Sequence, residues 1–395
     1  MDVAAEVQGI SAFSLELHQT MVKMGNNNEV ANNVVVSPLS IAITLALASA
    51  GAQGATRKQI AAVLKLPEGD PLHEFSSQLK SVVLADGSGQ GGPLLNFVNR
   101  TWVEQTLKLR PSFQKLLKDS YGSEVGSVDF LHEPNEAREK VNAWAKEETN
   151  GRIEDLLPEG SIDASTRMVL SNALYFKGAW DNPFAESNTK DSEFYLLDGT
   201  SLKVPMMQSK KNQYIKSFQT FKALRLRYAA GNDRRIFSMY ILLPHEKKGL
   251  QDLEQSLTPE ALSHALSQIT LEVPVTDFQL PKFKISCGFE VLQALQTLGL
   301  TLPFSQDADF TEMLDSTVTD DLYISNIFHK AFVEVNEKGT EAAAATGAVI
   351  RLKCAPMFGK SEDFVADHPF LFVIKEELTK VILFTGHVTN PTNPI

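Results

Sequence analysis

Residues 337–348 read EKGTEAAAATGA, and nine of these twelve residues are glycine, alanine or threonine. Alanine is a strong helix former, yet a packed helix needs large apolar anchors, and this stretch has none. When the stretch is read with the two-residue period of a strand, one face carries small residues only: Thr340, Ala342, Ala344, Thr346 and Ala348. A strand with such a face could slide into a tight slot between existing strands.

The residues that follow, VIRLKCAP at positions 349–356, have the character of an exposed segment with basic residues at which a protease can cut. The two stretches together predict a small-residue hinge that leads into a bait for a protease. Two other interpretations remain open, a short alanine-rich helix and a strand end followed by a loop.

Further from this stretch, the apolar patterns indicate helices early in the chain and strands late. Ser37 is placed to cap a helix that has Pro38 in its first turn and that ends at Gly51 and Gly54. Other helices are predicted over residues 12–21, 56–64 and 134–150, and strands over 96–104, 167–176, 222–228, 237–243, 327–335, 370–374 and 381–388. Without a regular βαβ alternation, the order predicts an α+β fold with large antiparallel or mixed sheets in one domain.

Four segments resemble the serpin family, and specifically the plant Z-type serpins, in the same order along the whole chain. They are NVVVSPLSI at 33–41, SNALYFKGAW at 171–180, HKAFVEVNEKGT at 329–340 and FVADHPFLF at 364–372. The resemblance implies one domain over residues 1–395, with about nine helices, three β-sheets, a metastable native state and an exposed reactive loop within residues 337–360.

The resemblance also implies roles for particular residues. In the family pattern, the residue before the cleaved bond is seventeenth from the hinge glutamate, and counting from Glu337 gives Lys353, with Cys354 after the cut. Ile350, Arg351 and Leu352 would then contribute to specificity. The loop hinge would comprise Glu337, Gly339, Thr340, Glu341, Ala342, Ala343, Ala344 and Ala345.

Two further features lie in or beneath the main sheet in this family. The polar shutter beneath the sheet would comprise Ser37, Ser40, Asn172 and His329. Trp180 would mark the breach, where the loop first inserts.

The activity implied is suicide inhibition of a protease partner, not enzymatic catalysis. Lys353 suits a trypsin-like serine protease whose specificity pocket holds a carboxylate, and Leu352 suits a papain-like cysteine protease. The rival hypothesis is a non-inhibitory serpin that binds or stores a ligand. An unrelated enzyme finds no support, because the sequence has neither a GxSxG nor a Walker motif.

Composition narrows the remaining function classes. The chain has 395 residues, of which 43% are hydrophobic and 22% charged, as in ordinary globular proteins. Its net charge of −11 argues against nucleic acid or an anionic membrane surface as a partner. The two cysteines, Cys287 and Cys354, make no disulfide framework and fit no metal motif, so no metal or cofactor is expected. The N-terminus lacks a signal-peptide pattern, so the protein is expected in the cytoplasm, or in the apoplast by a leaderless route. It is expected to be a monomer.

Four minor features receive structural interpretations. Residues 87–92 fit GxGxxG, but Pro93 and a strand-like run follow, which favours a surface loop over a nucleotide site. Asn99 opens a glycosylation sequon that matters only for an exported chain. His329 and His368 are expected to be buried and hydrogen-bonded. The eight basic residues Lys210, Lys211, Lys216, Lys222, Arg225, Arg227, Arg234 and Arg235 predict a solvated face, with a polyanion or partner site as the alternative.

Overall fold

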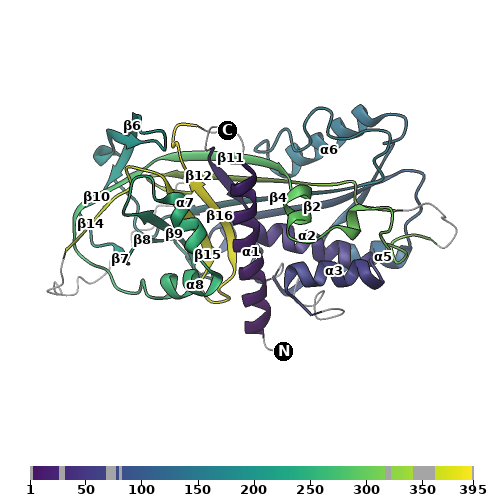
Figure 1. Ribbon diagram of the computed structural model, residues 1–395, viewed down its shortest axis with the longest axis horizontal. Helices are drawn as coiled ribbons and strands as arrows, with labels where there is room; N and C mark the ends of the chain where they lie inside the picture. Colours follow the sequence, from purple (N-terminus) through teal and green to yellow (C-terminus); the bar gives the residue numbers. More distant parts are fainter. Residues whose placement is uncertain are drawn as a thin grey trace.

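The long strands of a six-stranded main sheet cross the molecule, and two further sheets and the helices are arranged around them (Figure 1). The computed structural model describes residues 3–25, 32–67, 77–79, 82–315, 322–340 and 361–393. Within these ranges, one large apolar core contains residues from all three sheets. No helix in the same ranges combines the length and the apolar character needed to cross a membrane.

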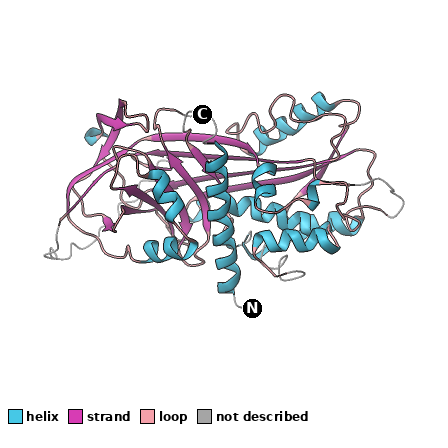
Figure 2. Ribbon diagram, in the orientation of Figure 1, coloured by secondary structure: helices cyan, strands magenta, loops and turns pink. Residues whose placement is uncertain are grey.

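Figure 2 shows the helices in cyan and the strands in magenta. The helices are α1 (Val3–Gly25), α2 (Pro38–Gly51), α3 (Gly54–Leu64), α5 (Pro111–Leu116), α6 (Pro134–Glu148), α7 (Leu250–Ser256), α8 (Pro259–Ser267) and α9 (Leu292–Thr297). The strands are β1 (Val34–Val36), β2 (Leu94–Glu104), β3 (Glu124–Val128), β4 (Met168–Ala179), β5 (Lys190–Tyr195), β6 (Ser201–Gln208), β7 (Tyr214–Ser217), β8 (Phe221–Arg227), β9 (Phe237–Pro244), β10 (Val275–Pro281), β11 (Phe283–Glu290), β12 (Asn326–Asn336), β13 (Gly339–Thr340), β14 (Glu362–Val365), β15 (Phe370–Glu376) and β16 (Ile382–Val388). Five of the described α-helices precede β4 in the chain, and three lie between β9 and β12.

The main sheet has the strand order β11-β12-β13-β4-β2-β3. A second sheet has the order β1-β16-β15-β9-β8-β7, and a third has the order β14-β10-β6-β5. Within the main sheet, β4 and β12 pair directly and in parallel, from Asn326 opposite Val169 to Phe332 opposite Tyr175. Beyond that point, the two-residue strand β13 lies between them and is antiparallel to both.

Helices cover both faces of the main sheet (Figure 1). On one face lies α2, whose residues are all buried because its sequence is apolar all round. Leu170 and Leu174 of β4 belong to the same core cluster as this helix. On the other face, Val169 and Ala173 of β4 pack in a separate cluster with α6. Alternate residues of β4 therefore point to opposite faces, and both faces are buried.

The predicted α+β class and the three sheets are confirmed. Ser37 caps α2 by accepting a hydrogen bond from the Ser40 amide, and Pro38 occupies the first turn, as expected. One prediction was wrong in detail, because Gly54 opens α3 and only Gly51 lies at the end of α2. The GxGxxG segment forms a short 3-10 turn at Ser88–Gln90 and leads into strand β2, so no helix presents its amides to a phosphate.

Candidate functional site

The start of the predicted hinge already lies inside the main sheet as part of a tight hairpin. We call β12, the two-residue turn Glu337–Lys338 and β13 the hinge hairpin. Asn336 pairs with Gly339 and Val335 with Thr340 across it. On its other side, β13 pairs with β4, where Thr340 lies opposite Gly178. The first residues of the hinge therefore occupy the position between β12 and β4 that a longer inserted strand would share.

Backbone hydrogen bonds fix the turn of the hinge hairpin to the segment that follows β4. The Trp180 indole Nε1 donates to the Asn336 carbonyl, and the Trp180 amide donates to the Lys338 carbonyl, both at 2.9 Å. The Phe184 amide donates to the Glu337 carbonyl at 2.9 Å. Trp180, predicted to mark the breach, thus lies directly against the turn that precedes β13.

The carboxylate of Glu337 adds a second anchor. It accepts a hydrogen bond from the Thr189 hydroxyl at 2.7 Å and forms an ion pair with Lys282 at 3.0 Å. Burial alone would raise the pKa of Glu337, but the Thr189 hydrogen bond and the Lys282 charge outweigh it, and the pKa is lowered. The turn is therefore held by an ionised carboxylate as well as by the main chain.

The two residues of β13 fit only because their side chains are small. A Cβ atom on Gly339 would lie 2.0 Å from the Gly178 carbonyl oxygen, a distance that only a backbone shift could relieve. Thr340 has no exposed surface, and its hydroxyl lies 2.6 Å from that of Tyr228. The Tyr228 ring stacks on Trp180, with 4.6 Å between ring centroids. A larger residue at position 340 would have to displace this aromatic pair.

The four residues predicted to form a polar cluster do lie together beneath the pairing of β4 and β12. Asn172 and His329 are direct partners across these two strands. The Asn172 carbonyl oxygen Oδ1 accepts from Ser40 Oγ at 2.8 Å and lies 2.7 Å from His329 Nδ1. His329 Nε2 accepts from the Ser37 amide at 3.0 Å. All four residues are buried, so the N-terminal turn of α2 is tied to both strands.

This network requires a neutral His329. Its Nε2 accepts from an amide, so the single proton of the ring belongs on Nδ1, where it is donated to Asn172. Asn172 is satisfied in turn, because its Nδ2 donates to the Ser40 carbonyl at 2.7 Å and to Thr44 Oγ1 at 2.6 Å. Burial lowers the pKa of His329 to about 3.

We therefore expect acid to destabilise the folded chain through His329. Between its unfolded pKa of about 6.5 and its folded pKa of about 3, the unfolded chain binds a proton that the folded chain rejects. The free energy of unfolding should fall as the pH decreases through this range, by at most about 1.4 kcal/mol per pH unit. The check is the midpoint of urea denaturation at pH 7.5, 6.0 and 5.0 for the wild type and His329→Gln. Equal pH slopes in the two proteins would contradict the prediction.

The remaining predicted site residues, Glu341, Ala342, Ala343, Ala344, Ala345, Ile350, Arg351, Leu352, Lys353 and Cys354, lie outside the described residues. The structure therefore brings together the polar cluster and places Trp180, Glu337, Gly339 and Thr340 at one end of the β4–β12 pairing. The predicted bond between Lys353 and Cys354 stays a prediction.

Several contacts of the site carry no signal in the sequence. Tyr228 is separated from Thr340 by 112 residues, and Thr189 from Glu337 by 148. Tyr228 was visible only as the end of an alternating strand, and Thr189, Lys282 and Thr44 belong to no motif. A contact between such distant positions can be recognised from the sequence only when the topology of the sheets is already known.

The prediction of a solvated basic face was wrong for two of its eight residues, Arg225 and Arg235, whose side chains are 17% and 11% exposed. Arg225 pairs with Glu377 at 3.0 Å, Arg235 pairs with Asp233 at 2.5 Å, and Lys222 pairs with Asp363. Arg225 lies in β8, where both faces are covered, since the neighbours Ala223 and Leu224 are both buried. Arg235 precedes β9 and also donates to the Val83 carbonyl at 2.7 Å.

The structure also shows the surroundings of His368 and of the sequon residue Asn99. His368 is buried, as predicted, with Nε2 at 2.8 Å from the Pro244 carbonyl. The sequon residue Asn99 lies within β2 and is only 8% exposed, so the folded chain offers its side chain little access to a glycosyl group.

Comparisons with known proteins agree with this geometry over nearly the full length. A family model described as Serpin (serine protease inhibitor) matches residues 8–391. The chain is 51% identical to Serpin-ZXA of Oryza sativa subsp. japonica, covering 91% of this chain and 90% of the relative. It is 48% identical to Serpin-ZX of Hordeum vulgare, covering 99% and 98%.

Solved structures show the same similarity in three dimensions. Arabidopsis AtSerpin1 in its native stressed conformation superposes with a TM-score of 0.91 and 44% identity, covering 100% of both chains. Human thyroxine-binding globulin in complex with thyroxine superposes with a TM-score of 0.84 and 26% identity, covering 99% of this chain and 100% of the other. The similarity thus extends across all three sheets.

Proposed function

This chain belongs to the serpin family of protease inhibitors, and from that premise we propose that it traps its target protease covalently by inserting its cleaved loop into the main sheet. The observation that carries the proposal is the position of β13. Gly339 and Thr340 already form a strand between β4 and β12. Insertion would extend a pairing that exists before any protease arrives.

In the proposed reaction, the nucleophile of the protease attacks the carbonyl carbon of Lys353. The bond to Cys354 breaks, the new amine leaves with Cys354, and Lys353 remains bound to the protease as an acyl-enzyme. The freed loop then adds residue by residue to β13, with hydrogen bonds to β4 on one side and β12 on the other. Serpin loop insertion is itself a standard example of this kind of strand addition.

The length of the loop determines how far the protease is carried. Thr340 to Lys353 is 14 residues, and a strand rises about 3.3 Å per residue, so the acylated Lys353 would travel roughly 45 Å. A protease pulled over that distance against the body of the inhibitor loses its active-site geometry before water can release it. The product is a covalent complex.

Before the loop can insert fully, strands β4 and β12 must separate. These strands are paired directly from residues 169 to 175 and from 326 to 332, and the polar cluster lies beneath this pairing. We propose that these contacts hold the uncleaved chain in a kinetically trapped state. The contacts that Asn172 and His329 make with Ser37 and Ser40 would restrain the sheet until the loop is cut.

Two classes of protease fit the proposed bait. Lys353 before the cleaved bond would enter a specificity pocket that contains a carboxylate, as in trypsin-like serine proteases. Leu352, one position earlier, would satisfy papain-like cysteine proteases. Arg351 and Ile350 would contribute further contacts.

A binding or storage protein is the second candidate, because thyroxine-binding globulin shares the fold and its structure contains thyroxine. The sequence of the hinge favours inhibition. Residues 342–345 are all alanine, and Thr340 is accommodated without exposed surface between β4 and β12. A chain that never inserts its loop has no need of small side chains there.

The deciding experiment is incubation of the protein with trypsin and, separately, with papain, followed by denaturing gel electrophoresis. We expect a band at the summed mass of inhibitor and protease that survives boiling in SDS, together with a released C-terminal peptide. If both proteases cleave the loop without forming such a band, or leave it uncut, the proposed inhibition of these two classes is wrong.

A further prediction concerns the two cysteines. Cys287 is 3% exposed, and burial raises its pKa to about 11, so it should resist thiol reagents. Cys354 follows the proposed cleaved bond and has Arg351 and Lys353 as neighbours, which favour the thiolate. We expect maleimide to label Cys354 at least about tenfold faster than Cys287. Glutathione on Cys354 should slow inhibition reversibly, since it would crowd the bond that a protease must grip.

Peptide mapping after brief labelling, together with inhibition rates before and after modification, measures both effects. Cys354→Ser is the control, because it should keep the inhibition rate and lose the response to glutathione. Equal labelling of the two cysteines, or an unchanged rate after modification of Cys354, would contradict the prediction.

A further inference from the structure

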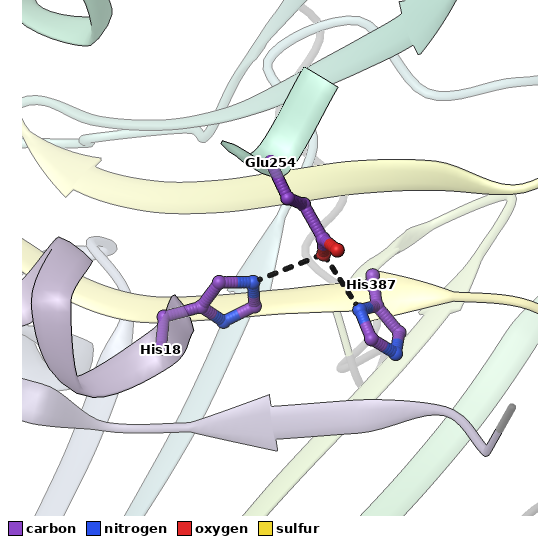
Figure 3. A group of neighbouring side chains, drawn as sticks. All are labelled: His18, Glu254 and His387. Carbon is purple, nitrogen blue, oxygen red and sulfur yellow. Dashed lines mark hydrogen bonds and ion pairs between the residues drawn. The ribbon is translucent and has the colours of Figure 1, made fainter. Parts of the chain in front are cut away.

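Three ionisable side chains that the inhibitory mechanism does not use meet in the interior, where α1, α7 and β16 approach one another. They are His18 of α1, Glu254 of α7 and His387 of β16, and Figure 3 shows both imidazole rings turned toward the carboxylate. We call them the histidine–glutamate cluster. His18 Nε2 lies 3.3 Å and His387 Nδ1 lies 2.7 Å from Glu254 Oε1. All three residues are buried.

His387 lies between two groups that can only accept hydrogen bonds. Its Nδ1 is 2.7 Å from Glu254 Oε1, and its Nε2 is 2.8 Å from the Asn32 carbonyl oxygen. A neutral imidazole has one N–H and cannot satisfy both. Either the ring carries a second proton, or a cation other than a proton occupies the position between Nδ1 and the carboxylate.

The outer contacts are those that metal-binding histidines usually make. Such a histidine binds the metal through one ring nitrogen and donates its other N–H to a carbonyl, carboxylate or hydroxyl. In His387, the outward Nε2 faces the Asn32 carbonyl. In His18, the outward Nδ1 lies 3.2 Å from Thr385 Oγ1. With its N–H donated to the Asn32 carbonyl, a neutral His387 would direct the Nδ1 lone pair toward Glu254. With its N–H donated to the Thr385 hydroxyl, a neutral His18 would direct the Nε2 lone pair there as well.

We propose that the histidine–glutamate cluster binds a zinc ion, with His18 Nε2, His387 Nδ1 and the Glu254 carboxylate as ligands. Two histidines and one glutamate are an established zinc ligand set. The three ligand atoms already lie within 4.8 Å of one another. Tetrahedral zinc at roughly 2.0–2.2 Å from each ligand holds them roughly 3.4 Å apart, so shifts of at most about 1.5 Å bring them to that geometry.

The charge at the site suits a divalent cation. The Glu254 carboxylate lies 3.3 Å from His18 Nε2 and 2.7 Å from His387 Nδ1, so it would supply a negative charge next to two nitrogen ligands. Zinc would take the place of the proton on His387 Nδ1. Each ring would then keep one N–H, on the nitrogen that faces away from the metal, and carry no charge of its own. The His18 and His387 rings meet edge to face, with centroids 5.9 Å apart, which leaves their nitrogens facing the same carboxylate.

A cavity of about 390 Å³ lies beside the cluster, and Glu254 is the one member of the cluster that lines it. The other lining residues are Gln19, Val22, Lys23, Gln251 and Gln255. Lys23 is the one cation among these lining residues, and it is exposed, so its ammonium group can turn toward solvent. The bound ion would join α1 to α7 and β16, three elements that are remote in sequence.

The test is zinc binding by the full-length protein. In a Cys354→Ser background, which removes a competing thiolate, we expect one zinc ion per chain by isothermal titration and elemental analysis, and a rise in Tm with added zinc. His18→Gln with His387→Gln should abolish both effects. His264→Gln, which changes an exposed histidine of α8, should leave them unchanged. Cobalt(II) should give the visible absorption of a tetrahedral site in the wild type only.

The double variant replaces two buried side chains, so a second, milder variant is needed in case the first does not fold. Thr385→Val leaves the three ligands in place but removes the hydroxyl behind His18, and should weaken zinc binding by about 10–100-fold. Absence of zinc binding in the wild type would favour a buried imidazolium–carboxylate pair instead. Equal affinity in the wild type and the double variant would place the ion elsewhere. Either result would overturn the proposal.

Discussion

Thr340→Arg is expected to turn the protein from an inhibitor into a substrate of its target protease. Thr340 has no exposed surface, lies between Gly178 and Val335, and places its hydroxyl 2.6 Å from that of Tyr228. An arginine there would be buried without an anionic partner, at a cost of several kcal/mol. Since each 1.4 kcal/mol slows a step about tenfold, insertion should become more than about a hundredfold slower and lose the race with deacylation.

The measurement is the stoichiometry of inhibition with trypsin, together with the fraction of cleaved inhibitor on a denaturing gel. Thr340→Arg should give cleaved, unbound inhibitor and almost no covalent complex. Thr340→Ser, which keeps a small side chain and a hydroxyl for Tyr228, should behave as the wild type. Covalent complexes formed one to one by Thr340→Arg would show that insertion does not begin at this residue.

Lys353→Ala should abolish complex formation with trypsin while the fold stays intact. The reason is chemical, because a trypsin-like pocket recognises the positive charge before the cleaved bond, and alanine offers none. We expect loss of the covalent band with trypsin and an unchanged midpoint of thermal unfolding. Lys353→Arg is the matched control, since it keeps a cation and should keep inhibition.

Mass spectrometry of the C-terminal peptide released by trypsin identifies the cleaved bond directly. The peptide should begin at Cys354. A peptide that begins at Leu352 would place the bond at Arg351–Leu352, and would show that counting seventeen residues from Glu337 does not locate it in this chain.

Local patterns in the sequence predicted several of the long elements but missed others, among them α7, α8, β5 and β6. The cap at Ser37 and the first turn at Pro38 depend only on neighbouring residues, and both are found. The β-rich runs became β2, β4, β9, β12, β15 and β16, with bounds that differ by at most a few residues. The resemblance to serpins then supplied the polar cluster, because its four residues lie in segments with recognisable motifs.

The sequence could not predict interactions that depend on how distant elements pack. His18 is 236 residues from Glu254, and His387 is 133 residues from it, so no spacing reveals their cluster. Arg225 looked like a residue of a solvated face because β8 alternates. Its partner Glu377 follows β15, and only the order of strands in the second sheet brings the two together.

The two-residue strand β13 also determines to which side of the sheet each later residue of the loop would point after insertion. With Thr340 turned toward Tyr228, even-numbered positions of an inserted strand share its side, and odd-numbered positions point the other way. From 342 to 354, the even residues are Ala342, Ala344, Thr346, Ala348, Ile350, Leu352 and Cys354, and none is charged. Glu341, Arg351 and Lys353, the charged residues of this segment, are all odd. Adding or removing one residue between Thr340 and Arg351 would exchange the two sets and turn both cations toward the core. The number of residues in the loop is therefore constrained as well as their type.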